Sequence, residues 1–159
     1  MLNTRLVAAL AGLALLGACS SDSAQDAANT GAGGAGAGQI RPGSQEDLVA
    51  NVGDRVFFAF DSSVIGADQR PTLERQARWM QQYPQVTVTV EGHADERGTR
   101  EYNLALGQRR ANAARDVLVA NGVAGARIAT ISYGKDRPAA LGSDEAAWAQ
   151  NRRAVTVVR

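Results

Sequence analysis

The stretch VTVTVE, residues 86–91, alternates strictly between valine and polar or charged residues. This pattern places the three valines on one face and predicts a half-buried β-strand. Three other segments are dense in Val, Ile or Phe and also predict strands: RVFFAF at residues 55–60, RIATISYG at 127–134 and RAVTVVR at 153–159. A chain with four such segments requires a small sheet, and the segments between them must cover it.

The first connecting segment predicts a helix that starts near Asp68, which serves as its cap, and has Pro71 in its first turn. Its apolar residues recur at i, i+4 and i+7, namely Leu73, Ala77 and Met80. The helix is expected to end at Tyr83-Pro84, because proline disfavours helical backbone in the residue before it.

A longer helix is predicted over residues 100–120, with Asn121-Gly122 as its stop. Its apolar stripe consists of Leu104, Ala111, Ala114 and Leu118. One further helical turn is expected near residues 144–150. The order β-α-β-α-β-(α)-β predicts an α/β fold of the α+β sandwich kind, with helices packed on a small mixed sheet. The first three strands should run parallel where adjacent and the fourth antiparallel, while the strand order stays open.

The N-terminal residues show an export signal rather than a packed core. Arg5 precedes an apolar run over residues 6–18, which is shorter than the ~20 residues that a transmembrane helix needs. The run ends in Leu16-Gly17-Ala18 before Cys19, the sole cysteine, and resembles a bacterial lipobox. That resemblance implies a signal peptide over residues 1–18, lipidation of Cys19 and, because residue 20 is Ser rather than Asp, placement in the outer membrane facing the periplasm.

Residues 20–39 contain no large apolar side chain, so residues 19–50 are interpreted as the lipidated cysteine and a flexible linker, and residues 51–159 as the folded domain. A flexible linker of about 30 residues has a mean reach of ~30 Å. Its GAGGAGAG run lacks the Gly-Lys-Ser/Thr ending of a nucleotide-binding loop. The net charge of +1 provides no basic excess for binding nucleic acid.

The densest group of charges, EGHADERGTREYNLALGQRRA at residues 91–111, follows the clearest strand. Ligands of open α/β sheets gather at the carboxyl ends of strands, where Asp95 and Asp61 are expected. Helical periodicity places Asn103, Leu106 and Arg110 on one face, separate from the apolar stripe. These five residues are therefore candidates to converge on one rim.

An aspartate and an arginine close together suit a zwitterionic ligand, since each provides the charge opposite to one end of it. The alternative is an ordinary surface ion pair, worth ~0–1 kcal/mol. Spacing alone leaves both possibilities open.

The segments FAFDSSVI, VEGHADERGTREYNLALGQRRA, SYGK and NRRAVTV resemble the OmpA-like peptidoglycan-binding domain family, and most closely its lipoprotein members. The resemblance covers the chain from about Asn51 onward. It implies that Asp95 and Arg110 clamp meso-diaminopimelate of the peptidoglycan stem peptide, with Asn103 and Asp61 nearby. Ala94 stands where many relatives have Thr, which removes one hydroxyl near the site.

The resemblance further implies a protein that anchors the outer membrane to peptidoglycan and works with the Tol envelope system in cell division. Its partners would include the periplasmic β-propeller protein of that system, which competes for an overlapping surface. The alternative is a protein that chiefly binds Tol partners and contacts the wall weakly.

Catalysis and metal binding are not expected. His93 is a single histidine with no cysteine near it, which falls short of a zinc site, so it is interpreted as a hydrogen-bonding loop residue. Ser132 and Ser143 lack a Gly-x-Ser-x-Gly context, and an arginine beside a carboxylate lowers the pKa that an acid catalyst needs raised. No cofactor is predicted. Arg152 and Arg153 are interpreted as a solvated edge of the last strand, with a contact to ligand carboxylates as the alternative.

Overall fold

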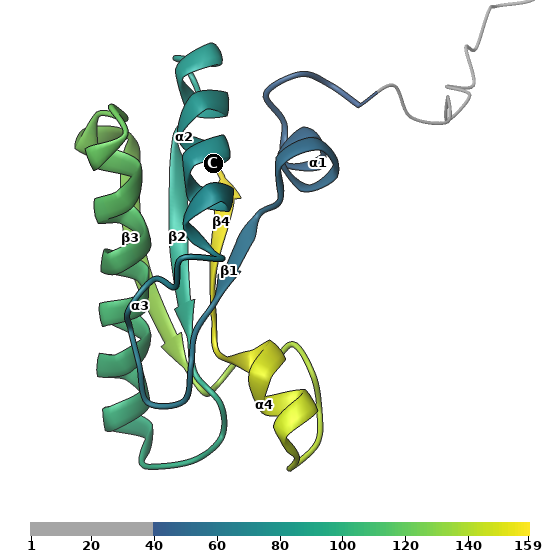
Figure 1. Ribbon diagram of the computed structural model, residues 1–159, viewed down its shortest axis with the longest axis vertical. Helices are drawn as coiled ribbons and strands as arrows, with labels where there is room; N and C mark the ends of the chain where they lie inside the picture. The colour runs from purple at the N-terminus through teal and green to yellow at the C-terminus, as the bar shows by residue number, and fades with distance from the viewer. Residues whose placement is uncertain (1–39) are drawn as a thin grey trace, which may run out of the picture. The chain divides into compact units, whose positions relative to one another are not determined.

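The computed structural model describes residues 40–159, so the predicted signal peptide, Cys19 and most of the predicted linker lie outside the described residues. The described part contains a four-stranded sheet in the order β1-β4-β2-β3 (Figure 1). The strands are β1 (Arg55–Phe57), β2 (Val88–His93), β3 (Ile128–Gly134) and β4 (Arg153–Val158).

The strand directions confirm the predicted mixed sheet. Strands β2 and β3 pair in parallel, whereas β4 runs antiparallel to both of its neighbours, β1 and β2. The last strand of the chain is therefore an interior strand. It inserts between the first two strands and brings the residues just before it next to the ends of both.

Two long helices, α2 (Arg70–Gln82) and α3 (Arg100–Ala120), lie against the sheet (Figure 1). The alternating valines of β2 are buried as predicted, and so are the three apolar residues predicted for α2, in one core with side chains from α3. The shorter elements are α1 (Gln45–Asp47), the π-helix η1 (Leu48–Val52), the 3-10 turn η2 (Gly125–Arg127) and α4 (Glu145–Asn151). None of the helices in residues 40–159 combines the length and the apolar character that crossing a membrane requires.

The predicted cap of α2 is wrong. The capping position is Gln69, whose side chain makes no cap hydrogen bond. The Asp68 carboxylate instead accepts a hydrogen bond of 2.7 Å from Nε2 of Gln69, because the backbone turns into the helix one residue later than the sequence indicates. The helix α3 has the predicted bounds and is capped by Thr99, whose side chain accepts from the backbone N–H of Tyr102.

The first strand is shorter than predicted and is not uniformly buried. Phe58 makes the last ladder-like bond, from its backbone N–H to the carbonyl of Arg152, and the chain then turns away from the sheet. Phe60 is consequently 60% exposed. Asp61 follows with φ of 54°, a left-handed conformation that is rare outside glycine.

Helix α3 packs directly on the backbone of β2 through two glycines. A Cβ atom on Gly92 would lie 1.8 Å from the carbonyl oxygen of Gly107, which leaves no room for a side chain there. This contact fixes the first half of α3 close to the carboxyl end of β2, where the charged segment of the sequence begins.

Candidate ligand-binding site

A cavity of about 180 Å³ lies where the loops after β1 and β2 meet the start of α3. Its lining consists of Phe60, Asp61, Asp95, Arg97, Gly98, Tyr102, Asn103, Leu106 and Arg110. All five residues predicted from the sequence are therefore brought together around one space. Their contact with a ligand stays a prediction.

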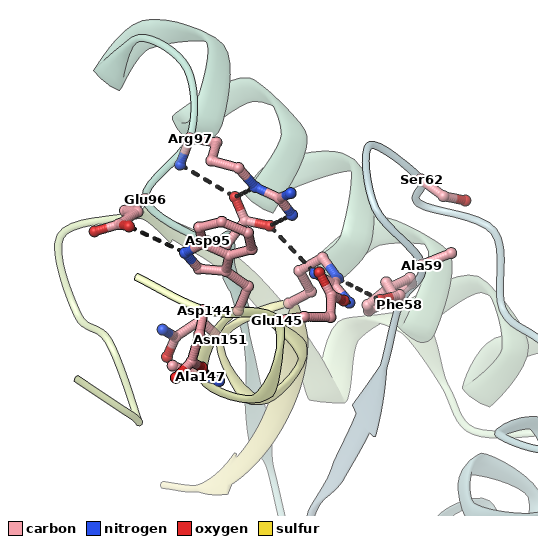
Figure 2. A network of polar contacts seen from close by, with 12 residues as sticks. Phe58, Ala59, Ser62, Asp95, Glu96, Arg97, Asp144, Glu145, Ala147 and Asn151 are labelled. Carbon is pink, nitrogen blue, oxygen red and sulfur yellow. Dashed lines mark hydrogen bonds and ion pairs between the residues drawn. The ribbon is translucent and has the colours of Figure 1, made fainter. Parts of the chain in front are cut away.

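Asp95 provides the buried negative charge of the cavity and is only 5% exposed. Arg97 donates to both of its carboxylate oxygens, from Nε at 3.2 Å and from Nη2 at 2.6 Å (Figure 2). Arg152 adds a longer contact of 3.4 Å from Nη1. Burial alone would raise the pKa of Asp95, but the bonds and charge of Arg97, helped by Arg152, outweigh burial and keep that pKa below its ordinary value. The carboxylate is thus ionised at neutral pH.

Arg110 provides the positive charge and is fully buried. Its guanidinium group donates to three backbone carbonyls, those of Ser62 at 2.8 Å, His93 at 2.9 Å and Ala59 at 3.1 Å. Burial lowers the pKa of Arg110 to about 10, which still leaves the side chain protonated at neutral pH. Each terminal nitrogen carries two N–H groups, so one N–H on each remains beyond these bonds.

The two opposite charges line the same cavity but are held by different partners. Backbone carbonyls fix the Arg110 guanidinium group from the loops after β1 and β2, whereas two other arginines surround Asp95. The Arg110 guanidinium group is held in place before a ligand arrives, and burial strengthens the field of both charges. The cavity therefore suits a molecule that carries both signs of charge.

Asn103 and Leu106 shape the site in different ways. The side-chain amide of Asn103 donates to the carbonyls of Arg97 at 2.8 Å and Thr99 at 3.1 Å, so it holds the loop that carries Asp95. Leu106 contributes a buried apolar surface to the lining.

Asp61 lies at the exposed side of the cavity, where its carboxylate accepts a hydrogen bond from the hydroxyl of Tyr102. Its left-handed backbone conformation occurs in the segment where the chain turns away from β1. Non-glycine residues in this region carry a cost of ~1–3 kcal/mol, and such residues cluster at functional sites.

The predicted solvated edge at the start of the last strand is wrong. Arg152 and Arg153 are both buried, because β4 is an interior strand rather than an edge. Arg152 also donates to the carbonyl of Phe58 at 3.0 Å and to Glu145 at 2.5 Å, and so joins the loop after β1 to α4. It also contacts Asp95, which local sequence patterns could not predict because the two residues lie far apart in the chain.

His93 is not the hydrogen-bonding loop residue that was expected. It is the last residue of β2 and is buried, and within residues 40–159 neither ring nitrogen has a hydrogen-bond partner. The structure also groups no three metal-ligating side chains together in that range.

Comparison with known proteins agrees with the fold and with the long motif. Residues 57–152 match the OmpA family. The peptidoglycan-associated lipoprotein of Mesorhizobium japonicum is 56% identical over 156 residues, which are 98% of this chain and 92% of the relative. That of Brucella melitensis is 60% identical over 130 residues, or 82% of this chain and 77% of the relative.

Solved structures show the same relationship. The crystal structure of the peptidoglycan-associated lipoprotein from Burkholderia pseudomallei superposes with a TM-score of 0.67 at 42% identity, covering 71% of this chain and all of that one. The C-terminal domain of Helicobacter pylori MotB has a TM-score of 0.63 at 26% identity, over 67% of this chain and 84% of that domain. The chain belongs to the OmpA family and, within it, to the peptidoglycan-associated lipoproteins.

Proposed function

We propose that this protein is a non-catalytic lipoprotein that anchors the outer membrane to peptidoglycan. In this proposal Cys19 carries the acyl chains in the outer membrane, and the domain faces the periplasm and binds the wall. The tether lies within the predicted linker, residues 19–50, but ends before residue 44, because Ser44 caps α1 and Leu48 is buried in the core of the domain. The names of its relatives support binding to peptidoglycan. The observation that carries the proposal is the pair of opposite buried charges, Asp95 and Arg110, around one cavity.

The ligand that fits these charges best is meso-diaminopimelate of the stem peptide. Its distal carbon carries an ammonium group and a carboxylate together. The ammonium group would face the carboxylate of Asp95, and the carboxylate would face the remaining N–H groups of Arg110. Charge-assisted hydrogen bonds of this kind contribute about 1.5–3 kcal/mol each. Leu106 would contact the apolar part of the ligand and Asp61 would border it.

The same contacts argue for binding without chemistry. A carboxylate whose pKa is lowered, as that of Asp95 is, cannot serve as a general acid near neutral pH. Arg110 is immobilised by three carbonyls and cannot move a proton at that pH. Recognition depends on charged side chains, and release of the ligand requires no covalent bond to break.

A second role, binding of Tol-system partners, is favoured by a groove that shares the loop after β1 with the cavity. A larger apolar groove of about 670 Å³ runs beside β1 and includes Phe57, Phe58 and Val64, of which Phe57 and Val64 are exposed. Exposed apolar side chains of this kind are typical of protein contacts. The periplasmic β-propeller protein of the Tol system is the partner that we propose for this role, in the Tol–Pal assembly of cell division.

Retention on purified sacculi tests both roles. The mature protein should sediment with sacculi, and the Asp95→Asn variant should remain in the supernatant, because truncating one partner of a desolvated charge pair costs about 2–5 kcal/mol. Undiminished sedimentation of the variant would contradict the clamp. Added Tol propeller protein separates the two roles, since a chain that chiefly binds Tol would pull that protein down strongly and sacculi poorly.

A substitution of Arg110 tests the other half of the proposed charge pair, but Arg110 also stabilises the fold. Arg110→Ala would leave three carbonyls without this donor, that of His93 in a buried position, and would weaken the fold itself. Arg110→Lys keeps the charge but cannot span the same positions, so reduced retention of a still folded Arg110→Lys protein is the informative result.

A further inference from the structure

Asp95 is bound by a cation of its own chain. Arg97 lies two residues further on and donates to both carboxylate oxygens, at 3.2 Å and 2.6 Å. Its backbone N–H also donates to Oδ1 at 3.1 Å. The guanidinium group therefore occupies the side of Asp95 where the ammonium group of the proposed ligand would bind.

Two aromatic rings hold the Arg97 guanidinium group in this position. Its Cζ atom lies 4.0 Å from the ring centroid of Phe60 and 4.0 Å from that of Trp148. The indole of Trp148 is itself fixed, because its N–H donates to Glu96 at 3.0 Å. The loop after β1 and helix α4 thus clamp a cation between them, which stabilises it through cation–π attraction.

Arg97 is nevertheless the member of the cluster that can leave. Its side chain is 31% exposed, whereas the side chain of Arg152, the other cation on Asp95, is 7% exposed. Arg152 is tied at the same time to Phe58 and Glu145. Of the two cations on Asp95, only Arg97 therefore has a partly solvent-exposed side chain.

We propose that Arg97 is a specificity-determining residue, an internal substitute for the ammonium group of the ligand that the ligand must displace from Asp95. This inference rests on the proposed function. A ligand binds Asp95 only in the fraction of molecules that Arg97 has vacated, and the apparent affinity falls by that fraction. A ligand without a cation cannot replace Arg97 on Asp95. A ligand that carries both a cation and a carboxylate can, and its carboxylate recovers the lost affinity by binding Arg110.

Calorimetric titration of the mature protein with a soluble stem tripeptide ending in meso-diaminopimelate tests this inference. The Arg97→Gln variant should bind the peptide roughly three- to tenfold more tightly than wild type, since removing the competing cation makes Asp95 permanently available. The same peptide acetylated on its distal amine should gain nothing from the substitution, because it has no cation for Asp95.

Arg100→Gln is the matched control. Arg100 also loses one positive charge when substituted, but it pairs with Asp136 at 2.8 Å on the surface, with 63% of its side chain exposed. This variant should bind the peptide as wild type does. Trp148→Leu provides a second, independent test, because it loosens the hold on Arg97 without changing the cavity lining. The Trp148→Leu variant should also bind the peptide more tightly than wild type does.

Displacement can also be observed directly. In a Trp79→Phe background Trp148 is the sole remaining tryptophan, and its fluorescence should change when the peptide removes Arg97 from its ring. The change should be absent in the Arg97→Gln protein.

Failure of the proposed role of Arg97 can be distinguished from failure of the proposed function. If wild type prefers the peptide over its acetylated form but Arg97→Gln binds it equally or more weakly, Arg97 does not compete with the ligand and this inference is wrong. If wild type shows no such preference, the proposed function fails and this inference fails with it.

Discussion

His93, the sole histidine of the chain, is buried at the end of β2 beside charges of both signs. Its Nε2 atom lies 3.8 Å from the carboxylate of Glu91. Burial, followed by the charge of Arg153 and then that of Arg137, lowers the pKa of His93 to about 4, against an opposing effect from the backbone of Arg137. Protonation therefore costs more in the folded than in the unfolded chain, and the imidazole stays neutral in the native protein.

This pKa predicts how stability depends on pH. Between pH 4 and 6.5 the unfolded chain binds the proton that the folded chain refuses, so the free energy of unfolding rises with pH across that window. The contribution of His93 is complete above pH 6.5 and is lost as pH falls towards 4, for a total of ~3 kcal/mol. Urea unfolding at several pH values measures it. The His93→Phe variant should lose this part of the slope, and an unchanged slope would show that His93 does not titrate as described.

The charged residues of the site differ in how far the sequence could predict them. Asp95 and Arg110 belong to one continuous motif, and strand-end position plus helical spacing suffice to bring them together. Arg152 lies far along the chain and reaches Asp95 only because β4 inserts beside β2. Local patterns cannot specify such a long-range pairing, so its burial and its contact were both missed.

At the scale of helices and strands, the position of the cavity depends on the contact between α3 and β2. Gly92 and Gly107 let the two backbones come into direct contact. Leu106 and Arg110, which line the cavity, lie close to Gly107 on the same helix. The direct contact sets the depth at which the Arg110 side chain reaches the loops after β1 and β2.

Gly92→Ala should therefore damage the fold. The new methyl group would meet a backbone oxygen at 1.8 Å, which no side-chain rotation can relieve, and the free energy of unfolding should fall by about 3 kcal/mol. Gly125→Ala is the control, since the nearest atom there is the flexible end of Arg115 at 3.1 Å. Chemical denaturation should show a large loss for the first variant and a small change for the second. Equal stabilities would contradict the close approach.

The elements themselves were largely predictable, because each depends on local periodicity or on a stop signal. The bounds of α3 and the alternation of β2 are examples. Strand order was not predictable, since an apolar run such as that of β4 fits an edge or an interior strand equally well. The predicted length of β1 was wrong for a related reason. Phe60 suggested a longer buried strand, but the chain leaves the sheet after Phe58 and the ring of Phe60 is exposed. Phe57 lies on the exposed face of β1.

At the scale of the whole molecule, the proposed function divides the chain into an anchor, a tether and a binding domain. The anchor and the tether up to residue 39 lie outside the described residues, and the anchor is proposed from the sequence around Cys19. Several acyl chains would hold the protein durably, whereas a single chain gives marginal membrane binding.

Cys19→Ser should consequently release the protein from the membrane without affecting its cavity. Fractionation should move the variant to the soluble periplasmic fraction, while retention on sacculi persists. Ser21→Ala, which leaves the cysteine intact, should stay in the membrane fraction. Membrane retention of the Cys19→Ser chain would contradict the anchor.

A double-mutant cycle between Asp95 and the distal amine of meso-diaminopimelate tests the proposed recognition of the stem peptide most directly. Binding of the free and the amine-acetylated stem tripeptide would be measured for wild type and for Asp95→Asn. If the two groups form the proposed charge pair, either change alone should cost about 2–5 kcal/mol, and the second should then cost little more. Fully additive losses would mean that Asp95 and the amine do not meet, and the proposed mode of recognition would be wrong.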